Sequence, residues 1–121
     1  MSARILIVED EPHIVESLTF LLTREGFEVE AIGDGDEALA ALAADLPRVL
    51  VLDAMLPGTD GFAILRQLRA EPRSARLPIL MLTAKGQRRD REIAEALGVD
   101  RFLAKPFSNA EVVAVVRELA G

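Results

Sequence analysis

The sequence contains no cysteine and a single histidine, His13, among its 121 residues. Without cysteine the chain forms no disulfide and performs no thiolate chemistry, which is compatible with a reducing compartment. His13 lies beside acidic residues at a predicted helix start, so a surface position is favoured over a phosphohistidine. With this histidine assigned to the surface, catalytic triads and histidine-based metal sites are excluded.

Long apolar runs are also absent. Glycine, proline and charged residues interrupt every run well short of the ~20 residues that a membrane span needs, and the first strand-like run follows Met1 too closely to leave room for a signal peptide. The sequence also lacks a G-x-x-x-x-G-K-[ST] loop, which argues against a P-loop NTPase. We therefore expect a cytoplasmic protein that makes no contact with membranes.

The net charge is −6, so the chain as a whole repels the phosphate backbone of nucleic acids. Arginine is frequent between Arg66 and Arg91, where solvated helix faces are the favoured interpretation, ahead of a protein-docking patch and of DNA contact. We do not expect nucleic acid as a direct partner.

Five short apolar runs alternate with helix-like segments over the whole chain. The runs are residues 5–8, 27–32, 49–52, 79–82 and 102–104, and the helices are expected from Pro12 to Gly26 and over 38–44, 62–70, 89–97 and 109 onwards. Continuous apolar runs suit strands that are buried on both faces, as in a parallel sheet, whereas the alternating run 27–32 suits an edge strand. The pattern predicts one domain, residues 1–121, with a doubly wound α/β sandwich of five βα units.

The polar residues that directly follow the strands carry the functional signal. Glu9, Asp10 and Glu11 follow the first strand, and Asp53, Thr83 and Lys105 follow the third, fourth and fifth strands. Ligands of open α/β sheets bind at the carboxyl ends of the strands, so these side chains are expected at one rim.

Asp53 closes a run of four apolar residues, with Asp10 expected on the neighbouring strand. Two close carboxylates repel unless a cation lies between them, and a hard divalent cation such as Mg²⁺ meets that need. Lys105 adds a positive charge that can reach a bound oxyanion. A carboxylate nucleophile, a metal and an ammonium are the parts of phosphoryl transfer, although any one of these residues alone is better explained as a strand cap.

Five motifs together resemble the receiver domain of two-component response regulators. They are Val8-Glu9-Asp10-Glu11, Leu52-Asp53-Ala54-Met55-Leu56-Pro57-Gly58, Asp60-Gly61, Leu82-Thr83-Ala84 and Lys105-Pro106-Phe107, and the match covers essentially all 121 residues in order. The resemblance implies a flavodoxin-like sheet with the strand order 2-1-3-4-5.

The resemblance also implies a role for each site residue. Asp53 would be the phosphorylated nucleophile, and Asp10 directly, Glu9 through water and the Met55 carbonyl would hold Mg²⁺, with Mn²⁺ as an alternative. Thr83 and Lys105 would bind phosphoryl oxygens, and the Lys105–Pro106 peptide would be cis. The donor would be a phosphohistidine of a sensor histidine kinase or of a histidine phosphotransfer protein. Such a domain phosphorylates itself and slowly dephosphorylates itself, as a signalling module rather than a metabolic enzyme.

Switching and output are implied in the same way. Phe102 resembles the switch aromatic that moves together with Thr83, and the signal would leave through the helix at 89–97, the strand at 102–104 and the last helix. Met55 and Lys85 occupy positions that tune dephosphorylation, and neither offers help to an attacking water. We expect output by protein–protein contact from a monomer, with dimerisation on phosphorylation as the alternative. The chain is expected to be either a stand-alone regulator or an excised receiver.

Three other functions share part of this sequence pattern. An Asp-nucleophile phosphatase of the haloacid dehalogenase type needs a second Asp at the position of Met55. A receiver-like module that works without phosphorylation would not need the acidic residues, Thr83 and Lys105. The segment from Gly33 to Ala38 fits a dinucleotide fingerprint, but its acidic residues would repel a pyrophosphate, and a turn with a helix start is the preferred interpretation.

Overall fold

The structure of the protein is a computed structural model that describes residues 2–84 and 88–121. Five strands alternate with five helices in these residues. In chain order they are β1 (Arg4–Val8), α1 (Pro12–Arg24), β2 (Glu28–Ile32), α2 (Gly35–Ala44), β3 (Val49–Asp53), α3 (Gly61–Ala70), β4 (Ile79–Thr83), α4 (Arg88–Ala96), β5 (Arg101–Ala104) and α5 (Asn109–Ala120). The predicted alternation of strands and helices is confirmed.

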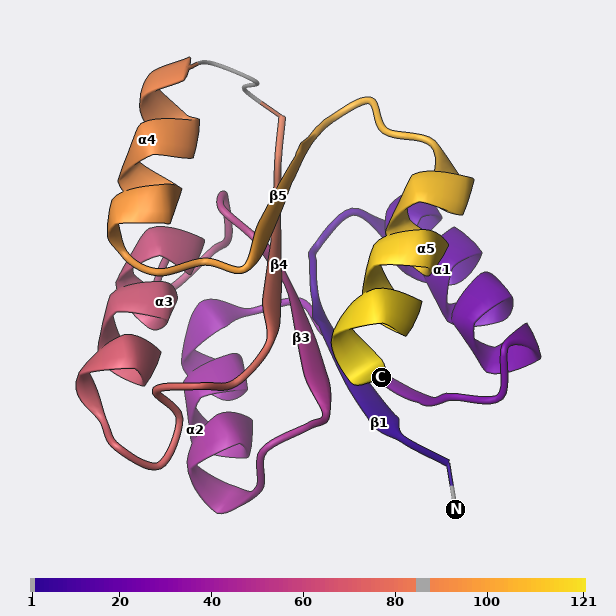
Figure 1. Ribbon diagram of the computed structural model, residues 1–121, viewed down its shortest axis with the longest axis horizontal. Helices are drawn as coiled ribbons and strands as arrows, with labels where there is room; N and C mark the ends of the chain where they lie inside the picture. The colour runs from indigo at the N-terminus through magenta and orange to yellow at the C-terminus, as the bar shows by residue number, and fades with distance from the viewer. Residues whose placement is uncertain (1, 85–87) are drawn as a thin grey trace.

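The strands form one parallel sheet in the order β2-β1-β3-β4-β5, as predicted. Helices α1 and α5 cover one face and α2, α3 and α4 cover the other (Figure 1). Each face has its own apolar core, one packed around Leu18, Leu22 and Val112, the other around Leu42, Ile64 and Leu68. The two cores explain why the inner strands β1, β3 and β4 are almost continuously apolar.

Local signals account for several helix ends. Pro12 starts α1 because its missing N–H group is not needed in the first turn, and Gly26, with φ of 96°, directs the chain out of that helix. Ser108 and Glu111 form the predicted capping box at the start of α5. Helix α2 begins three residues before the predicted 38, because the Asp34 side chain accepts a hydrogen bond from the Glu37 N–H and caps the helix there.

The register of the sheet brings the strand ends to one rim. Val8 of β1 pairs with Leu52 of β3, and Asp53 pairs with Leu82 of β4. Glu9, Asp53 and Thr83 therefore lie at the carboxyl edge of three adjacent strands. Within the two described ranges, no helix is long and apolar enough to cross a lipid bilayer.

Candidate functional site

Asp53 is the last residue of β3 and is buried, with 2% of its surface exposed. Its Oδ1 accepts a hydrogen bond from the Met55 N–H at 3.2 Å, and its Oδ2 lies 3.4 Å from the Lys105 ammonium. These contacts fix a carboxylate at the end of an apolar strand, where few water molecules compete for it. The arrangement holds a charged oxygen in one orientation at the rim.

Glu9 and Asp10 lie beside Asp53, as predicted from the strand ends. One carboxylate oxygen from each of the three residues lies within 4.8 Å of the others. Glu9 is buried like Asp53, whereas Asp10 is exposed. The cluster is therefore open to solvent on the Asp10 side and closed at its base.

Lys105 reaches the same cluster from the end of β5. Its Nζ lies 2.8 Å from Glu9 Oε1, 3.4 Å from Asp53 Oδ2 and 3.6 Å from Glu11 Oε2. The Lys105–Pro106 peptide is cis, as expected. One ammonium thus faces carboxylates that belong to three different residues, and the local charge stays negative.

Burial sets the electrostatics of Glu9. The pKa of Glu9 is raised from 4.5 to about 7, chiefly because burial removes water from its charged form; the Lys105 contact opposes this shift and Asp53 adds to it. Burial by itself would lower the pKa of Lys105, but its contacts with Glu9 and Asp53 outweigh that effect and raise the pKa. The protein alone therefore compensates the buried Glu9 carboxylate incompletely.

The surroundings of the buried Glu9 carboxylate show whether a divalent cation fits this cluster. Glu9 Oε2 accepts a hydrogen bond from the Glu11 N–H at 3.1 Å. Glu9 Oε1 lies 2.8 Å from the Lys105 ammonium, which also faces Asp53 and Glu11. A buried carboxylate with a raised pKa, close to two other carboxylates that share one ammonium with it, matches the all-oxygen ligand set of Mg²⁺. The donor set fits the predicted metal.

The other predicted residues fall at or behind the rim. Thr83 ends β4 and is buried, while its backbone carbonyl accepts a hydrogen bond from the Lys105 N–H at 2.6 Å. The Met55 side chain is exposed beside Asp53. Phe102 is 8% exposed, and the Arg91 guanidinium of α4 lies 5.2 Å from its ring centroid. Lys85 lies outside the described residues.

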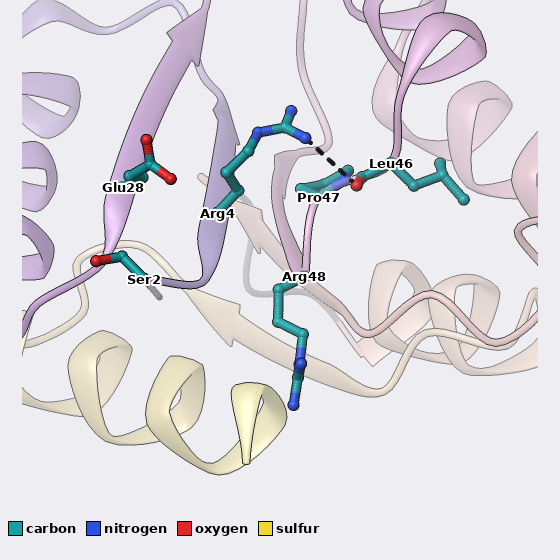
Figure 2. A pocket seen from close by; sticks show the side chains of 6 residues that line it. All are labelled: Ser2, Arg4, Glu28, Leu46, Pro47 and Arg48. Carbon is teal, nitrogen blue, oxygen red and sulfur yellow. Dashed lines mark hydrogen bonds between the residues drawn. The ribbon is translucent and has the colours of Figure 1, made fainter.

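Of two cavities at opposite ends of the sheet, only one adjoins the site. One, of about 430 Å³, adjoins the rim between the start of α1 and the segment that follows β5, and Glu11, His13 and Lys105 line part of it. A larger one, of about 610 Å³, lies at the opposite, amino-terminal ends of the strands (Figure 2). There Arg4 points toward the Leu46 carbonyl and also pairs with Asp45 at 2.7 Å, so its charge is already compensated. The larger cavity takes no part in the chemistry at the rim.

The fold and the rim together define a flavodoxin-like α/β protein of the receiver type. The chain belongs to the response regulator receiver domain family, whose model matches residues 5–117. Among similar curated proteins is the phosphate regulon transcriptional regulatory protein PhoB of Rhizobium meliloti, 44% identical over 119 residues, which are 98% of this chain and 52% of PhoB. The chain thus spans about half the length of that relative.

Solved structures agree with this assignment. The receiver domain of the Francisella response regulator 1452 superposes with a TM-score of 0.91 at 27% identity, covering 98% of this chain and 97% of that one. The receiver domain of sensor histidine kinase PA1611 from Pseudomonas aeruginosa superposes with a TM-score of 0.85 at 31% identity, covering 100% of this chain and 99% of that one. The latter structure holds a magnesium ion in its active-site cleft.

Sequence reasoning identified the rim residues but missed two features. It did not foresee that Glu9 is buried while Asp10 is exposed. It also missed Arg69, whose guanidinium joins α3 to the Gly98 carbonyl, the Ser74 carbonyl and the Asp100 carboxylate. Both depend on tertiary packing, and no local motif marks either of them.

Proposed function

We propose that Asp53 accepts a phosphoryl group from a phosphohistidine of a sensor histidine kinase or a histidine phosphotransfer protein. The observation that carries this proposal is the buried Asp53 carboxylate, oriented by the Met55 N–H and placed 3.4 Å from the Lys105 ammonium within a carboxylate cluster. As a receiver domain, the chain acts in two-component signalling. Its phosphorylation is a signal rather than a metabolic step.

The transfer is an in-line displacement. An oxygen of Asp53 forms a bond to phosphorus as the phosphorus–nitrogen bond of the donor breaks, and the imidazole leaves with the bonding electrons. Lys105 pairs with one oxygen of the transferred group, and the Thr83 hydroxyl donates a hydrogen bond to another.

Asp10 directly, Glu9 through water, Asp53 and the Met55 carbonyl would hold Mg²⁺, and Mn²⁺ would use the same oxygen ligands. When bound, the metal neutralises negative charge that otherwise accumulates between the carboxylates and the phosphoryl oxygens. The carboxylate oxygens of Glu9, Asp10 and Asp53, which lie within 4.8 Å of one another, support this assignment.

Phosphorylation then changes packing at Thr83 and Phe102. Thr83 moves toward the phosphoryl group, and the Phe102 ring adjusts to the space it leaves. The ring already contacts Arg91, so its movement is transmitted to the surface of α4, β5 and α5. Output is by protein–protein contact on that surface.

The chain is a monomer before phosphorylation. Arg101 pairs with Glu118 and Arg117 pairs with Glu25 at 3.3 Å within the same chain, so these side chains are engaged without a second copy.

The net charge of the chain, −6, disfavours direct contact with nucleic acid, although the similar PhoB is named a transcriptional regulator. The whole of 1–121 acts as one receiver domain in the cytoplasm, where its kinase donor presents the phosphohistidine.

Intact-mass measurement after incubation with acetyl phosphate and Mg²⁺ tests the proposal. We expect one phosphoryl adduct on the wild type, none on Asp53→Asn, and none when a chelator removes the metal. The exposed, apolar Met55 does not orient an attacking water, so the adduct persists for minutes or longer after the donor is removed. Multiple turnover of phosphate esters would instead indicate the haloacid dehalogenase type, and an unmodified wild type would indicate a phosphorylation-independent module.

A further inference from the structure

The segment of residues 54–60, here called the acceptor loop, joins β3 to α3 and packs tightly against the first turn of α2. A β-carbon built on Gly35 would lie 1.7 Å from the Thr59 carbonyl oxygen and 2.7 Å from its carbonyl carbon. Both atoms are backbone, so neither can move aside as a flexible side chain would. Position 35 therefore accepts glycine only in this arrangement, because the backbone of α2 touches the backbone of the acceptor loop.

Two hydrogen bonds cross the same contact. The Gly35 N–H donates to the Pro57 carbonyl at 2.9 Å, and the Thr59 hydroxyl donates to Asp36 Oδ1 at 2.6 Å. Gly58, with φ of +75°, faces the same turn, and a β-carbon there would lie 2.9 Å from oxygens of Asp34 and Asp36. The middle of the acceptor loop is thus held by α2 through backbone, side-chain and steric contacts together.

The ends of the acceptor loop are fixed on Asp53 itself. The Met55 N–H donates to Asp53 Oδ1 at 3.2 Å, and the Gly61 N–H donates to the Ala54 carbonyl at 3.0 Å. A β-carbon on Gly61 would lie 2.2 Å from the Asp53 carbonyl oxygen. A continuous series of short contacts therefore runs from the first turn of α2 to the carboxylate of the phosphoacceptor.

We propose that Gly35 and Thr59 are positioning residues for the divalent-cation site, and this inference rests on the function proposed above. Neither residue is expected to touch the cation. They fix the acceptor loop, which carries the Met55 carbonyl and the N–H group that orients Asp53. Ala54 and Leu56 anchor the start of the acceptor loop on the core, but most of its remaining residues are exposed, so the α2 contacts order its middle.

The most conservative test removes the Thr59 hydroxyl alone. Thr59→Val keeps the shape of the side chain but breaks the bond to Asp36, and Thr59→Ser restores the hydroxyl. Gly35→Ala is a second, stronger variant, whose folding is checked by circular dichroism. Amide hydrogen exchange without metal should be faster at Gly35 and Met55 in Thr59→Val, and close to wild type in Thr59→Ser.

The second readout is Mn²⁺ binding to the full chain, followed by electron paramagnetic resonance, with Mg²⁺ as competitor. Loss of one hydrogen bond predicts a Kd raised by about fivefold in Thr59→Val, a larger rise in Gly35→Ala, and recovery in Thr59→Ser. Glu37→Gln is the charge control, because it removes an exposed acid from the same helical turn. Asp36→Asn removes one charge as well and also alters the acceptor of the Thr59 hydrogen bond, so it should weaken Mn²⁺ binding more than Glu37→Gln does.

The two proposals fail in different ways. If the wild type binds neither Mn²⁺ nor Mg²⁺, the cation site and the function built on it are overturned. If the wild type binds but Thr59→Val and Gly35→Ala bind equally well, with unchanged amide exchange, only the positioning role is overturned.

Discussion

The ammonium nitrogen of Lys105 lies 2.8 Å from Oε1 of Glu9, and the two side chains are 14% and 0% exposed. The pair lies at the base of the same cluster that is expected to hold a divalent cation. A bound cation and Lys105 therefore attract the same carboxylates. We therefore expect Lys105 to have two opposing effects: it should disfavour metal binding and favour binding of the transferred phosphoryl group.

Lys105→Met separates these two effects. Removing the ammonium leaves the carboxylates less compensated, so Mg²⁺ affinity should rise by at least about fivefold. Phosphorylation by acetyl phosphate should slow by about 100-fold, because one charged contact to the transferred group is lost. Isothermal titration and intact mass measure the two quantities.

Arg88→Met is the control for net charge, because the Arg88 side chain is 92% exposed. It should leave both quantities unchanged. A Lys105→Met variant that binds Mg²⁺ more weakly than the wild type would contradict the opposing roles assigned to this ammonium.

The raised pKa of Glu9 predicts how stability depends on pH without metal. The pKa is about 7 in the folded state and 4.5 in the reference state. Because the pKa of Glu9 is higher in the folded state, folding favours the protonated carboxyl group. The contribution of Glu9 to the free energy of unfolding is therefore fully present below a pH of 4.5 and is lost as the pH rises through about 7. With a chelator present, Tm should fall between about pH 5 and pH 7.5.

Glu9→Gln should remove this part of the slope, since it does not titrate. Saturating Mg²⁺ should also flatten the slope in the wild type, because metal binding favours the ionised carboxylate. If the wild type and Glu9→Gln show the same dependence of Tm on pH without metal, the buried carboxyl group of Glu9 is compensated in some other way.

Phe102 and Phe20 offer a matched pair for core packing. Each ring has an arginine near its face, Arg91 at 5.2 Å and Arg24 at 5.6 Å, but Phe20 is 60% exposed and Phe102 only 8%. Phe102→Ala should lower the free energy of unfolding by about 3 kcal/mol, and Phe20→Ala by less than about 1 kcal/mol. Urea denaturation followed by circular dichroism measures both. Equal losses would mean that Phe102 contributes no more to the core than a surface ring.

Arg69 predicts a second stability effect far from the rim. Its guanidinium bonds to the Gly98 carbonyl at 2.9 Å, the Ser74 carbonyl at 3.1 Å and Asp100 Oδ2 at 3.0 Å. Arg69→Met keeps the aliphatic stem but removes all three bonds. The Ser74 carbonyl and Asp100 Oδ2 still accept from the Leu77 and Ile79 N–H groups, so the free energy of unfolding should fall by about 2 kcal/mol rather than by the cost of three unpaired acceptors.

Arg66→Met, an exposed position on the same helix, is the matched control and should cost little. Phosphorylation at Asp53 should persist in Arg69→Met below its melting temperature. If the two variants unfold at the same urea concentration, the three bonds of Arg69 contribute no net stability.

The sequence was sufficient for the architecture, because each strand carries its own signal. Continuous apolar runs marked the buried strands β3 and β4, and alternation marked the edge strand β2. The first polar residue after a continuous apolar run lies at the rim, which is why Asp53 and Thr83, the last residues of β3 and β4, could be predicted without any tertiary information.

Contacts between distant segments were not accessible in that way. Gly35 follows a strand and opens a helix, so its sequence context indicates only a turn, whereas its packing on Thr59 depends on how α2 lies against the acceptor loop. The burial of Glu9 rather than Asp10 likewise depends on where the chain leaves β1 relative to β3 and Lys105. Such features are set by tertiary packing, and periodicity carries no information about them.

The most direct test of the central claim identifies the phosphorylated atom. The chain is incubated with acetyl phosphate and Mg²⁺, treated with borohydride, which reduces an aspartyl phosphate to homoserine, and mapped by peptide mass spectrometry. We predict homoserine at position 53 and nowhere else, lost when Mg²⁺ is chelated and absent from Asp53→Asn. Homoserine at another acidic residue, or a phosphoryl group on His13 with Asp53 unmodified, would contradict the account.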